Sequence, residues 1–505
     1  MKKVILYILS FLPLLAFAQS NYDKGVELFT KKDYKGAMDY FSKETAANPN
    51  DFEAHNFMGI IKGELEDYTG SLDEFSKAVA INPKAFKAYA NRAHVKTVTH
   101  DYKGAIADCY LAIEINPQYD PAYENRGAAK SAMGDFNGAI ADFNKTIELN
   151  PKNITVYNNR GNTKIGMNDF NGAIADFNKA IEINPQYAEA YVNRGIAKKN
   201  LNDLNGAMVD FTAAIGLNPK LDVAYSDRGF TKNILKDQAG AMADYNQAIA
   251  INPKCVEAFD NRGVLKFQAR DYTGAMADFN EAVTINPQFA GAYYDRAEAK
   301  FVMNDANGAL TDMTTSISLN PNNANAYHDR GSMKSRLGDN AGAIVDLTRA
   351  IEINPKFDMA YFNRAIAEAS TQDFKSALDD FSKAITLAPE KPESYYYRGY
   401  LTLMFMRGDP AVALGDFDKA ISLGFASADA YCYRGECKNM THDLAGAMTD
   451  LNQAIQLNPK QAQAYSYRAQ VKYLQSDKAG ACADWSMSVQ LGNTRAQGDL
   501  DHYCK

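Results

Sequence analysis

The 505-residue sequence lacks the short motifs that mark most catalytic and metal sites. It has no glycine-rich phosphate loop, no nucleophile elbow and no Cys-x-x-Cys pair. The histidines are few and show no metal-ligand spacing: His55, His94, His100, His328, His442 and His502. These absences argue against an enzyme, and we expect no catalytic residue, no cofactor and no bound metal.

Blocks of basic residues are also missing. The chain carries 54 Lys and Arg against 61 Asp and Glu, a formal charge of −7. An acidic chain without a basic cluster is a poor partner for nucleic acid or for an anionic membrane surface. Beyond the N-terminus no stretch is apolar enough to cross a bilayer. We therefore expect no nucleic-acid partner and no stable membrane insertion after N-terminal processing.

The first residues, MKKVILYILSFLPLLAFAQS, are typical of a secretory signal. Two lysines precede the apolar run from Val4 to Leu15, and Ala16-Phe17-Ala18 supplies the small residues of a cleavage site. The alternative is a membrane anchor, but the run is short and contains Pro13. The sequence predicts a signal peptide over residues 1–18 and an exported chain, periplasmic or secreted.

A proline recurs every 34 residues along most of the chain: Pro49, Pro83, Pro117, Pro151, Pro185, Pro219, Pro253, Pro287, Pro321, Pro355 and Pro389. The next repeat is two residues longer and has Phe425 in this place, after which Pro459 and Asn493 resume the step. This period predicts fourteen repeats over residues 19–493, the twelfth lengthened by two residues. Residues 494–505 are expected to form a capping helix.

Each repeat has the pattern of two helices. In the fourth repeat an aromatic and a small residue stand four apart in the first helix, Tyr123 and Gly127. Ala139 and Phe143 show a similar spacing in the second. An Asp stands between the two helices in every repeat, where its carboxylate suits the N-cap of the second helix. These residues are Asp33, Asp67, Asp101, Asp135, Asp169, Asp203, Asp237, Asp271, Asp305, Asp339, Asp373, Asp409, Asp443 and Asp477.

These repeats resemble the tetratricopeptide repeat (TPR). The fourth repeat matches its pattern with Tyr123, Gly127, Ala139, Phe143, Thr146 and Pro151. The second aromatic is replaced elsewhere by Cys109, Met313, Leu347 and Leu451, and by Trp485 in the last repeat. The resemblance implies an all-α fold, a right-handed superhelical α-solenoid whose concave wall binds a protein or peptide. Physical reasoning agrees, because a single helical hairpin buries its apolar side only against neighbouring hairpins.

Cations recur on the packed side of the first helix. An Arg precedes the small residue in twelve repeats, and an Asp follows it sixteen residues later, or eighteen in the lengthened repeat. Examples are Arg126 with Asp142 and Arg194 with Asp210. The first two repeats lack both, having Lys24 with Tyr40 and Met58 with Glu74. One interpretation is a row of arginines for anionic ligands, but the shared presence and shared absence favour a structural ion pair.

The residue before this Arg often faces the concave side in the TPR family. Here it is Asn91, Asn125, Asn159, Asn193, Asn261 and Asn363, interrupted by Asp227, Asp295 and Asp329. The row looks like the asparagine ladder in the TPR superhelix of O-linked N-acetylglucosamine transferase. An Asn amide can both donate to and accept from a peptide backbone. The alternative is that these amides bond only to the neighbouring hairpin.

Tyrosines replace the asparagines toward the C-terminus. Tyr397, Tyr433 and Tyr467 occupy the same position, and Tyr396 and Tyr400 stand beside the first of them. Such side chains suit an adaptable binding surface. They could also fill the gap that the two-residue insertion opens.

One disulfide is expected. Cys482 and Cys504 flank the predicted turn at Gly492 and Asn493 at similar distances, so an antiparallel hairpin brings them together. Cys432 and Cys437 are five apart on one helix, a poor geometry for a bond.

The sequence therefore predicts an exported, non-catalytic scaffold that holds a protein or peptide in its concave groove. One alternative is a glycan- or cell-wall-binding protein that uses exposed tyrosines, and another is an enzyme accessory subunit.

Overall fold

The computed structural model describes residues 20–405 and 409–505, so the predicted signal peptide, residues 1–18, lies outside the described residues. Within the described ranges the regular secondary structure is helical throughout, with 29 α-helices and no strand. None of these helices is long and apolar enough to span a membrane. The chain divides into two compact units, Met1–Ala258 and Phe259–Lys505.

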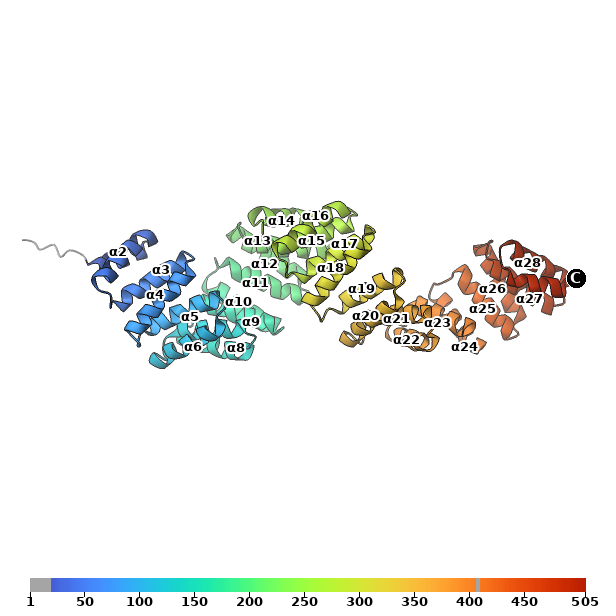
Figure 1. The fold of residues 1–505 in the computed structure, drawn as a ribbon, viewed down its shortest axis with the longest axis horizontal. Coiled ribbons are helices and arrows are strands. Elements are labelled where there is room, and N and C mark those ends of the chain that lie inside the picture. Colours follow the sequence, from blue (N-terminus) through green and yellow to red (C-terminus); the bar gives the residue numbers. More distant parts are fainter. Residues whose placement is uncertain (1–19, 406–408) are drawn as a thin grey trace, which may run out of the picture. The chain divides into compact units, whose positions relative to one another are not determined.

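Helices alternate as first and second members of hairpins (Figure 1). The first helices are α1 (Asn21–Thr30), α3 (Phe52–Glu64), α5 (Phe86–Val98), α7 (Asp120–Ala132), α9 (Ile154–Gly166), α11 (Ala188–Asn200), α13 (Asp222–Ile234), α15 (Val256–Gln268), α17 (Ala290–Val302), α19 (Ala324–Arg336), α21 (Asp358–Ser370), α23 (Pro392–Met404), α25 (Ala428–Met440) and α27 (Ala462–Leu474).

The second helices are α2 (Tyr34–Ala47), α4 (Tyr68–Ile81), α6 (Tyr102–Ile115), α8 (Phe136–Leu149), α10 (Phe170–Ile183), α12 (Leu204–Leu217), α14 (Gln238–Ile251), α16 (Tyr272–Ile285), α18 (Ala306–Leu319), α20 (Asn340–Ile353), α22 (Phe374–Leu387), α24 (Pro410–Ser422), α26 (Leu444–Leu457) and α28 (Lys478–Gln490). A last helix, α29 (Arg495–Tyr503), follows them.

The turn inside each hairpin is set by the expected Asp. Asp135 Oδ1 accepts the backbone N–H of Gly138 at 3.0 Å, which caps the first turn of α8. A Cβ on Gly138 would lie 2.1 Å from Asp135 Oδ2, so glycine lets the two residues approach closely, whereas the backbone N–H of Ser376 makes the same hydrogen bond to Asp373 at 3.2 Å. The residue before the Asp takes the left-handed conformation that ends the first helix, as in Gly134 with φ of 83°.

Packing inside a hairpin depends on the small residue of the first helix. The ring of Phe143 on α8 lies against Gly127 on α7, where an added Cβ would be 2.7 Å from the ring. Phe143 and Ala139 are fully buried. Burial of such a ring stabilises the fold by about 1.5–3 kcal/mol, so the pair ties the two helices firmly together.

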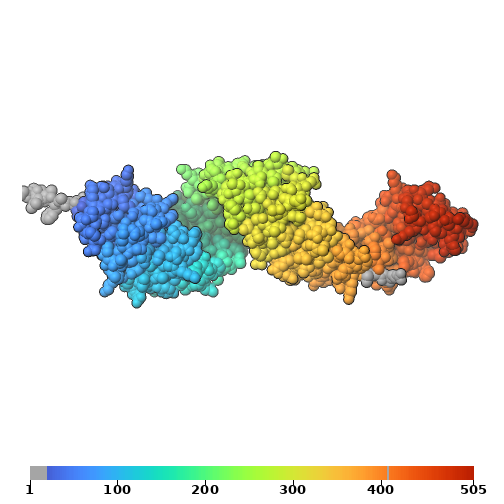
Figure 2. All heavy atoms as spheres, viewed as in Figure 1, coloured from blue at the N-terminus to red at the C-terminus, as the bar shows by residue number. Residues whose placement is uncertain are grey.

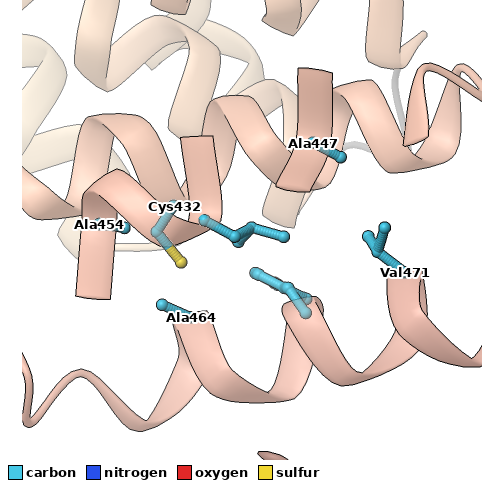
Figure 3. Packing of buried hydrophobic residues seen from close by; sticks show 7 residues of the cluster. Cys432, Ala447, Ala454, Ala464 and Val471 are labelled. Carbon is cyan, nitrogen blue, oxygen red and sulfur yellow. The ribbon is translucent and has the colours of Figure 1, made fainter. Parts of the chain in front are cut away.

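Packing continues from one hairpin to the next within each unit. In the second unit, Ala464 and Val471 of α27 face Cys432 of α25 and Ala447 and Ala454 of α26 (Figure 3). Within each unit the surface colours follow the order of the sequence, as expected when each hairpin contacts its neighbours (Figure 2). The fold is therefore an all-α solenoid of stacked helical hairpins, and the fold class expected from the sequence is confirmed.

Candidate functional site

The recurring Arg and Asp form a two-pronged ion pair between the two helices of a hairpin. Arg194 Nε and Nη2 on α11 donate to the two carboxylate oxygens of Asp210 on α12 at 2.9 and 2.6 Å. Lys198 Nζ lies 2.8 Å from the same carboxylate. The Asp210 side chain is only 1% exposed. Buried charge of this kind persists only with such partners.

The same guanidinium also reaches the preceding hairpin. Arg194 Nη1 donates to Asn178 Oδ1 on α10 at 2.6 Å, so one side chain joins three helices. Arg126 makes the equivalent pair with Asp142, at 2.9 and 2.6 Å, and lies over the Tyr110 ring of α6 at 4.5 Å. The guanidinium groups are therefore engaged in intramolecular contacts, which favours a structural role over a row of anion ligands.

The second repeat makes a related contact with other residues. It has Met58 in place of Arg, yet Glu74 of α4 is buried and accepts from His55 Nδ1 at 2.7 Å and Lys62 Nζ at 2.9 Å. Burial acts to raise the pKa of Glu74, but these hydrogen bonds outweigh it and hold the pKa below its usual value. The sequence pattern missed this cluster because His55 stands one turn earlier than the usual cation.

The expected asparagine row bonds to the preceding hairpin. Asn91 Nδ2 donates to Asn56 Oδ1 at 3.0 Å, and Asn193 Nδ2 donates to Asn158 Oδ1 at 2.8 Å. Asn125 Nδ2 donates to the carbonyl of Ala90 at 2.9 Å, and Asn159 Nδ2 to Glu124 Oε1 at 3.5 Å. Asn363 Nδ2 contacts His328 Nε2 at 2.8 Å and Ser332 Oγ at 3.1 Å. Asn261 is half-buried on α15. These contacts engage the amide nitrogens and leave the amide oxygens as the groups that can face a ligand.

Two of these asparagines border a cavity of about 400 Å³ in the first unit. Ile60 and Gly63 of α3, Phe75 of α4, and Val95 and Val98 of α5 supply its apolar walls. Glu64, Asn91, His94 and Asn125 add polar groups around them. Apolar and polar groups thus line this cavity in similar measure, and a concave pocket with apolar walls and a few polar groups is the usual form of a small recognition site. His94 is exposed, and it belongs to no motif of the sequence.

The C-terminal tyrosines form a ring cluster. Tyr396 packs on Phe425 with ring centroids 4.7 Å apart, and Tyr400 on Tyr433 at 5.1 Å. Tyr397 is the more open member, 36% exposed. It borders, with Tyr400 and Phe405, a cavity of about 550 Å³.

Tyr467 departs from the expectation of an exposed tyrosine. It is 8% exposed and packs in the core of α25, α26 and α27 against Cys432, Leu451 and Val471. An exposed platform at Tyr467 is therefore wrong. Its ring fills the space between hairpins instead.

Acidic side chains gather on three successive first helices of the second unit. Burial, followed by the charge of Asp260, raises the pKa of Asp295, and burial followed by Asp329 raises the pKa of Glu298. The Tyr294 hydroxyl donates to Asp329, which also lies 2.8 Å from His328 Nδ1. Stacking alone brings these residues together, since they come from different repeats.

The cysteines form one close pair and four buried free thiols. The sulfurs of Cys482 on α28 and Cys504 after α29 lie at bonding distance, with Cα atoms 5.7 Å apart. Cys109, Cys255, Cys432 and Cys437 are free and buried. Among residues 20–405 and 409–505, no group of three or more His, Cys, Asp or Glu side chains is placed to hold a metal ion.

Comparison with known proteins gives family matches in several repeats. A family described as TPR repeat matches residues 165–202, and families described as tetratricopeptide repeat match residues 328–392 and residues 120–153, 188–221 and 256–289. No curated protein matches the chain.

Solved structures with similar folds include the APC/C hetero-tetramer Cut9–Hcn1. It is 13% identical, covers 95% of each chain and gives a TM-score of 0.53, which is a likeness of fold alone. MamA is 25% identical over 32% of this chain and 95% of its own, with a TM-score of 0.30. YrrB, titled a TPR protein with an unusual peptide-binding site, is 22% identical over 36% of this chain and 95% of its own, also with a TM-score of 0.30.

Proposed function

Since this chain belongs to the tetratricopeptide repeat family, we propose that it is a non-catalytic scaffold that binds a protein or peptide partner on its wall of first helices. The cavity bordered by Asn91 and Asn125 is its principal site. The observation that carries this proposal is the combination of apolar walls with amide oxygens left available at the edge.

The cavity suits one apolar side chain of an extended peptide. Phe75, Val95 and Val98 would surround that side chain, while Asn91 Oδ1 and Asn125 Oδ1 would accept backbone N–H groups. Each such hydrogen bond contributes about 0.5–1.5 kcal/mol. The asparagines would thus bind the peptide backbone at the edge of the cavity, and the volume of the cavity would select the side chain by size.

The test begins with peptides selected from a random library on the mature chain, whose affinities are then measured by calorimetry. Asn91→Ala and Asn125→Ala should each weaken binding several-fold. Asn193→Ala is the matched control, because Asn193 makes the same Asn–Asn contact with the preceding hairpin but does not border this cavity. Equal affinities for wild type, Asn91→Ala and Asn125→Ala would rule the site out.

A second candidate function is glycan or cell-wall binding at the aromatic cavity of the second unit. The half-open ring of Tyr397 beside Tyr400 and Phe405 supports it, because sugar rings stack on aromatic faces. Soluble wall fragments should then quench tyrosine fluorescence in wild type and less so in Tyr397→Ala. Unchanged fluorescence at saturating fragment concentration would exclude this function.

Export and the Cys482–Cys504 disulfide are part of the same proposal. Osmotic-shock fractionation should release a mature chain that begins at Gln19, as read by N-terminal sequencing. Denatured without reductant, that chain should show the four free thiols of Cys109, Cys255, Cys432 and Cys437. Six free thiols would show that the bond does not form.

A further inference from the structure

The ion pair has one variable position, the second cation. In ten repeats a Lys stands one turn after the Arg and places its Nζ 2.7–2.8 Å from the buried Asp: Lys96, Lys130, Lys164, Lys198, Lys232, Lys266, Lys300, Lys334, Lys438 and Lys472. In the hairpin of α21 and α22 this position is Glu368, and in the next hairpin it is Thr402. Glu368 therefore reverses the charge at a place where a lysine is usual.

The carboxyl group of Glu368 lies beside the ion pair. Its Oε1 is 3.7 Å from Arg364 Nε, which itself donates to Asp380 Oδ2 at 2.6 Å. Glu368 is 8% exposed, and its Oε2 is buried without a hydrogen-bond partner in the described part of the chain. A buried carboxylate oxygen without a partner loses the water that would otherwise stabilise it. Burial, followed by the charge of Asp380, therefore raises the pKa of Glu368 to about 7, and above that pH the ionised carboxylate is stabilised by a cation.

The charges around the pair point to the same requirement. An Asp, an Arg and a Lys sum to one positive charge, whereas ionised Glu368, Asp380 and Arg364 sum to one negative charge. The ten lysine repeats show that a cation can share the Asp carboxylate with the Arg. Arg194 Nε and Lys198 Nζ, for example, both contact Asp210 Oδ2. The guanidinium of Arg364 therefore leaves room for a second positive group on Asp380.

Comparison with the other repeats indicates a third oxygen atom near Asp380, a main-chain carbonyl. Lys164 Nζ donates to the carbonyl of Gly172 at 3.3 Å, and Lys232 makes the same contact with Gly240 at 3.4 Å. Ser376 occupies the equivalent position in α22. Two carboxylates and a main-chain carbonyl are hard oxygen ligands of the kind that Ca²⁺ takes, with water completing its flexible coordination.

We propose that Glu368, Asp380 and the carbonyl of Ser376 bind a hard divalent cation such as Ca²⁺, at the place where ten other repeats hold a lysine ammonium. With few protein ligands the affinity is modest, on the order of 10⁻⁴–10⁻³ M, as in extracellular modules. Thr402 supplies no carboxylate and donates to the carbonyl of Arg398, so the neighbouring repeat does not form such a site. This proposal is independent of the peptide site in the first unit.

The experiment measures Ca²⁺ binding by calorimetry and Tm by scanning calorimetry on the mature chain. The pH is about 8, above the raised pKa of Glu368, so that this carboxyl group is ionised. In wild type, Ca²⁺ at about 10 mM should raise the Tm by a few degrees. Glu368→Lys should raise the Tm without Ca²⁺ and abolish the Ca²⁺ response. Because this variant restores the residue of ten other repeats, it is expected to fold.

Two further variants make the outcome decisive. Glu368→Gln should lose the Ca²⁺ response without gaining a cation. Asp379→Asn, which removes an exposed carboxylate of α22 next to Asp380, should keep the response. The proposal is overturned if wild type shows neither heat nor a Tm shift with Ca²⁺. It is equally overturned if Glu368→Gln responds as wild type does.

Discussion

The hairpin of α11 and α12 and the hairpin of α21 and α22 have the same backbone plan but differ at the second cation. Asp210 is held by Arg194 and Lys198, whereas Asp380 is held by Arg364 with Glu368 beside it. Both keep the two-pronged Arg–Asp pair. The comparison teaches that these two hairpins share the Arg–Asp pair, while the position one turn after the Arg can change and acquire a new property.

The largest expected effect comes from removing the fixed pair. Arg194→Ala leaves Asp210 buried with one cation and should cost about 3–5 kcal/mol of folding free energy. Urea denaturation followed by circular dichroism gives the measurement, and Lys220→Ala at an exposed position is the control. Equal midpoints for the two variants would contradict a structural role for the pair.

A single substitution should give the hairpin of α11 and α12 the same charges as the hairpin of α21 and α22. Lys198→Glu removes an ammonium from Asp210 and adds a like charge, so we expect a loss of about 2–3 kcal/mol in the absence of Ca²⁺. Part of this loss should return when Ca²⁺ is added. A destabilised variant that Ca²⁺ leaves unchanged would show that the α21–α22 site depends on more than its two carboxylates.

Glu436 extends the comparison to a half-buried carboxyl group whose hydrogen-bond partner is the Asn439 amide. Burial raises the pKa of Glu436 to about 7, while the Asn439 amide acts weakly against this. The folded chain thus binds this proton more tightly than the unfolded chain, so stability is greatest below the unfolded pKa and falls as pH rises through about 7. The change should be about 1–2 kcal/mol, allowing for partial solvent screening.

The measurement is the denaturation midpoint of wild type and Glu436→Gln across this pH range. The variant carries no titrating carboxyl there, so the difference between the two chains should grow with pH. A difference that stays constant would assign the pH dependence to other groups, such as Asp295 and Glu298.

The smallest expected effect comes from supplying a missing lysine. Within residues 20–405 and 409–505, Arg398 is the one cation that holds Asp416, at 2.9 and 2.6 Å, and Thr402 occupies the lysine position. Thr402→Lys should stabilise the chain by about 0.5–1 kcal/mol, the range of a partly exposed ion pair. A lower Tm in this variant would show that the lengthened repeat orients α23 differently from the lysine repeats.

Sequence reasoning could predict the fold because the same few residues return every 34 positions. Asp135 and its counterparts indicate where second helices begin, and the shared presence of Arg and Asp points to a pair. Bond partners were harder to predict. The spacing alone does not determine whether Asn125 faces a ligand or the carbonyl of Ala90.

Other features depend on how neighbouring hairpins stack. Tyr397 and Tyr467 occupy one position of the repeat, yet the first is 36% exposed and the second 8%. The acidic side chains around Asp295 meet only across successive first helices. Glu368 is different, because the sequence alone identifies it as an exception. When the repeats are aligned, it is the one acidic residue at the position that usually holds the lysine.

Because these Arg side chains contact three helices, the repeat pattern limits which insertions and deletions the chain can accept. The Arg donates to a residue sixteen positions earlier, on the second helix of the preceding hairpin. This residue is an Asn for Arg160, Arg194 and Arg296, and a Thr for Arg330 and Arg364. Any junction between two hairpins within a unit therefore presents compatible partners to any other. Whole repeats could be lost or duplicated without leaving a buried charge unmatched. A deletion of another length inside a hairpin would change the sixteen-residue spacing between the Arg and the Asp of that hairpin.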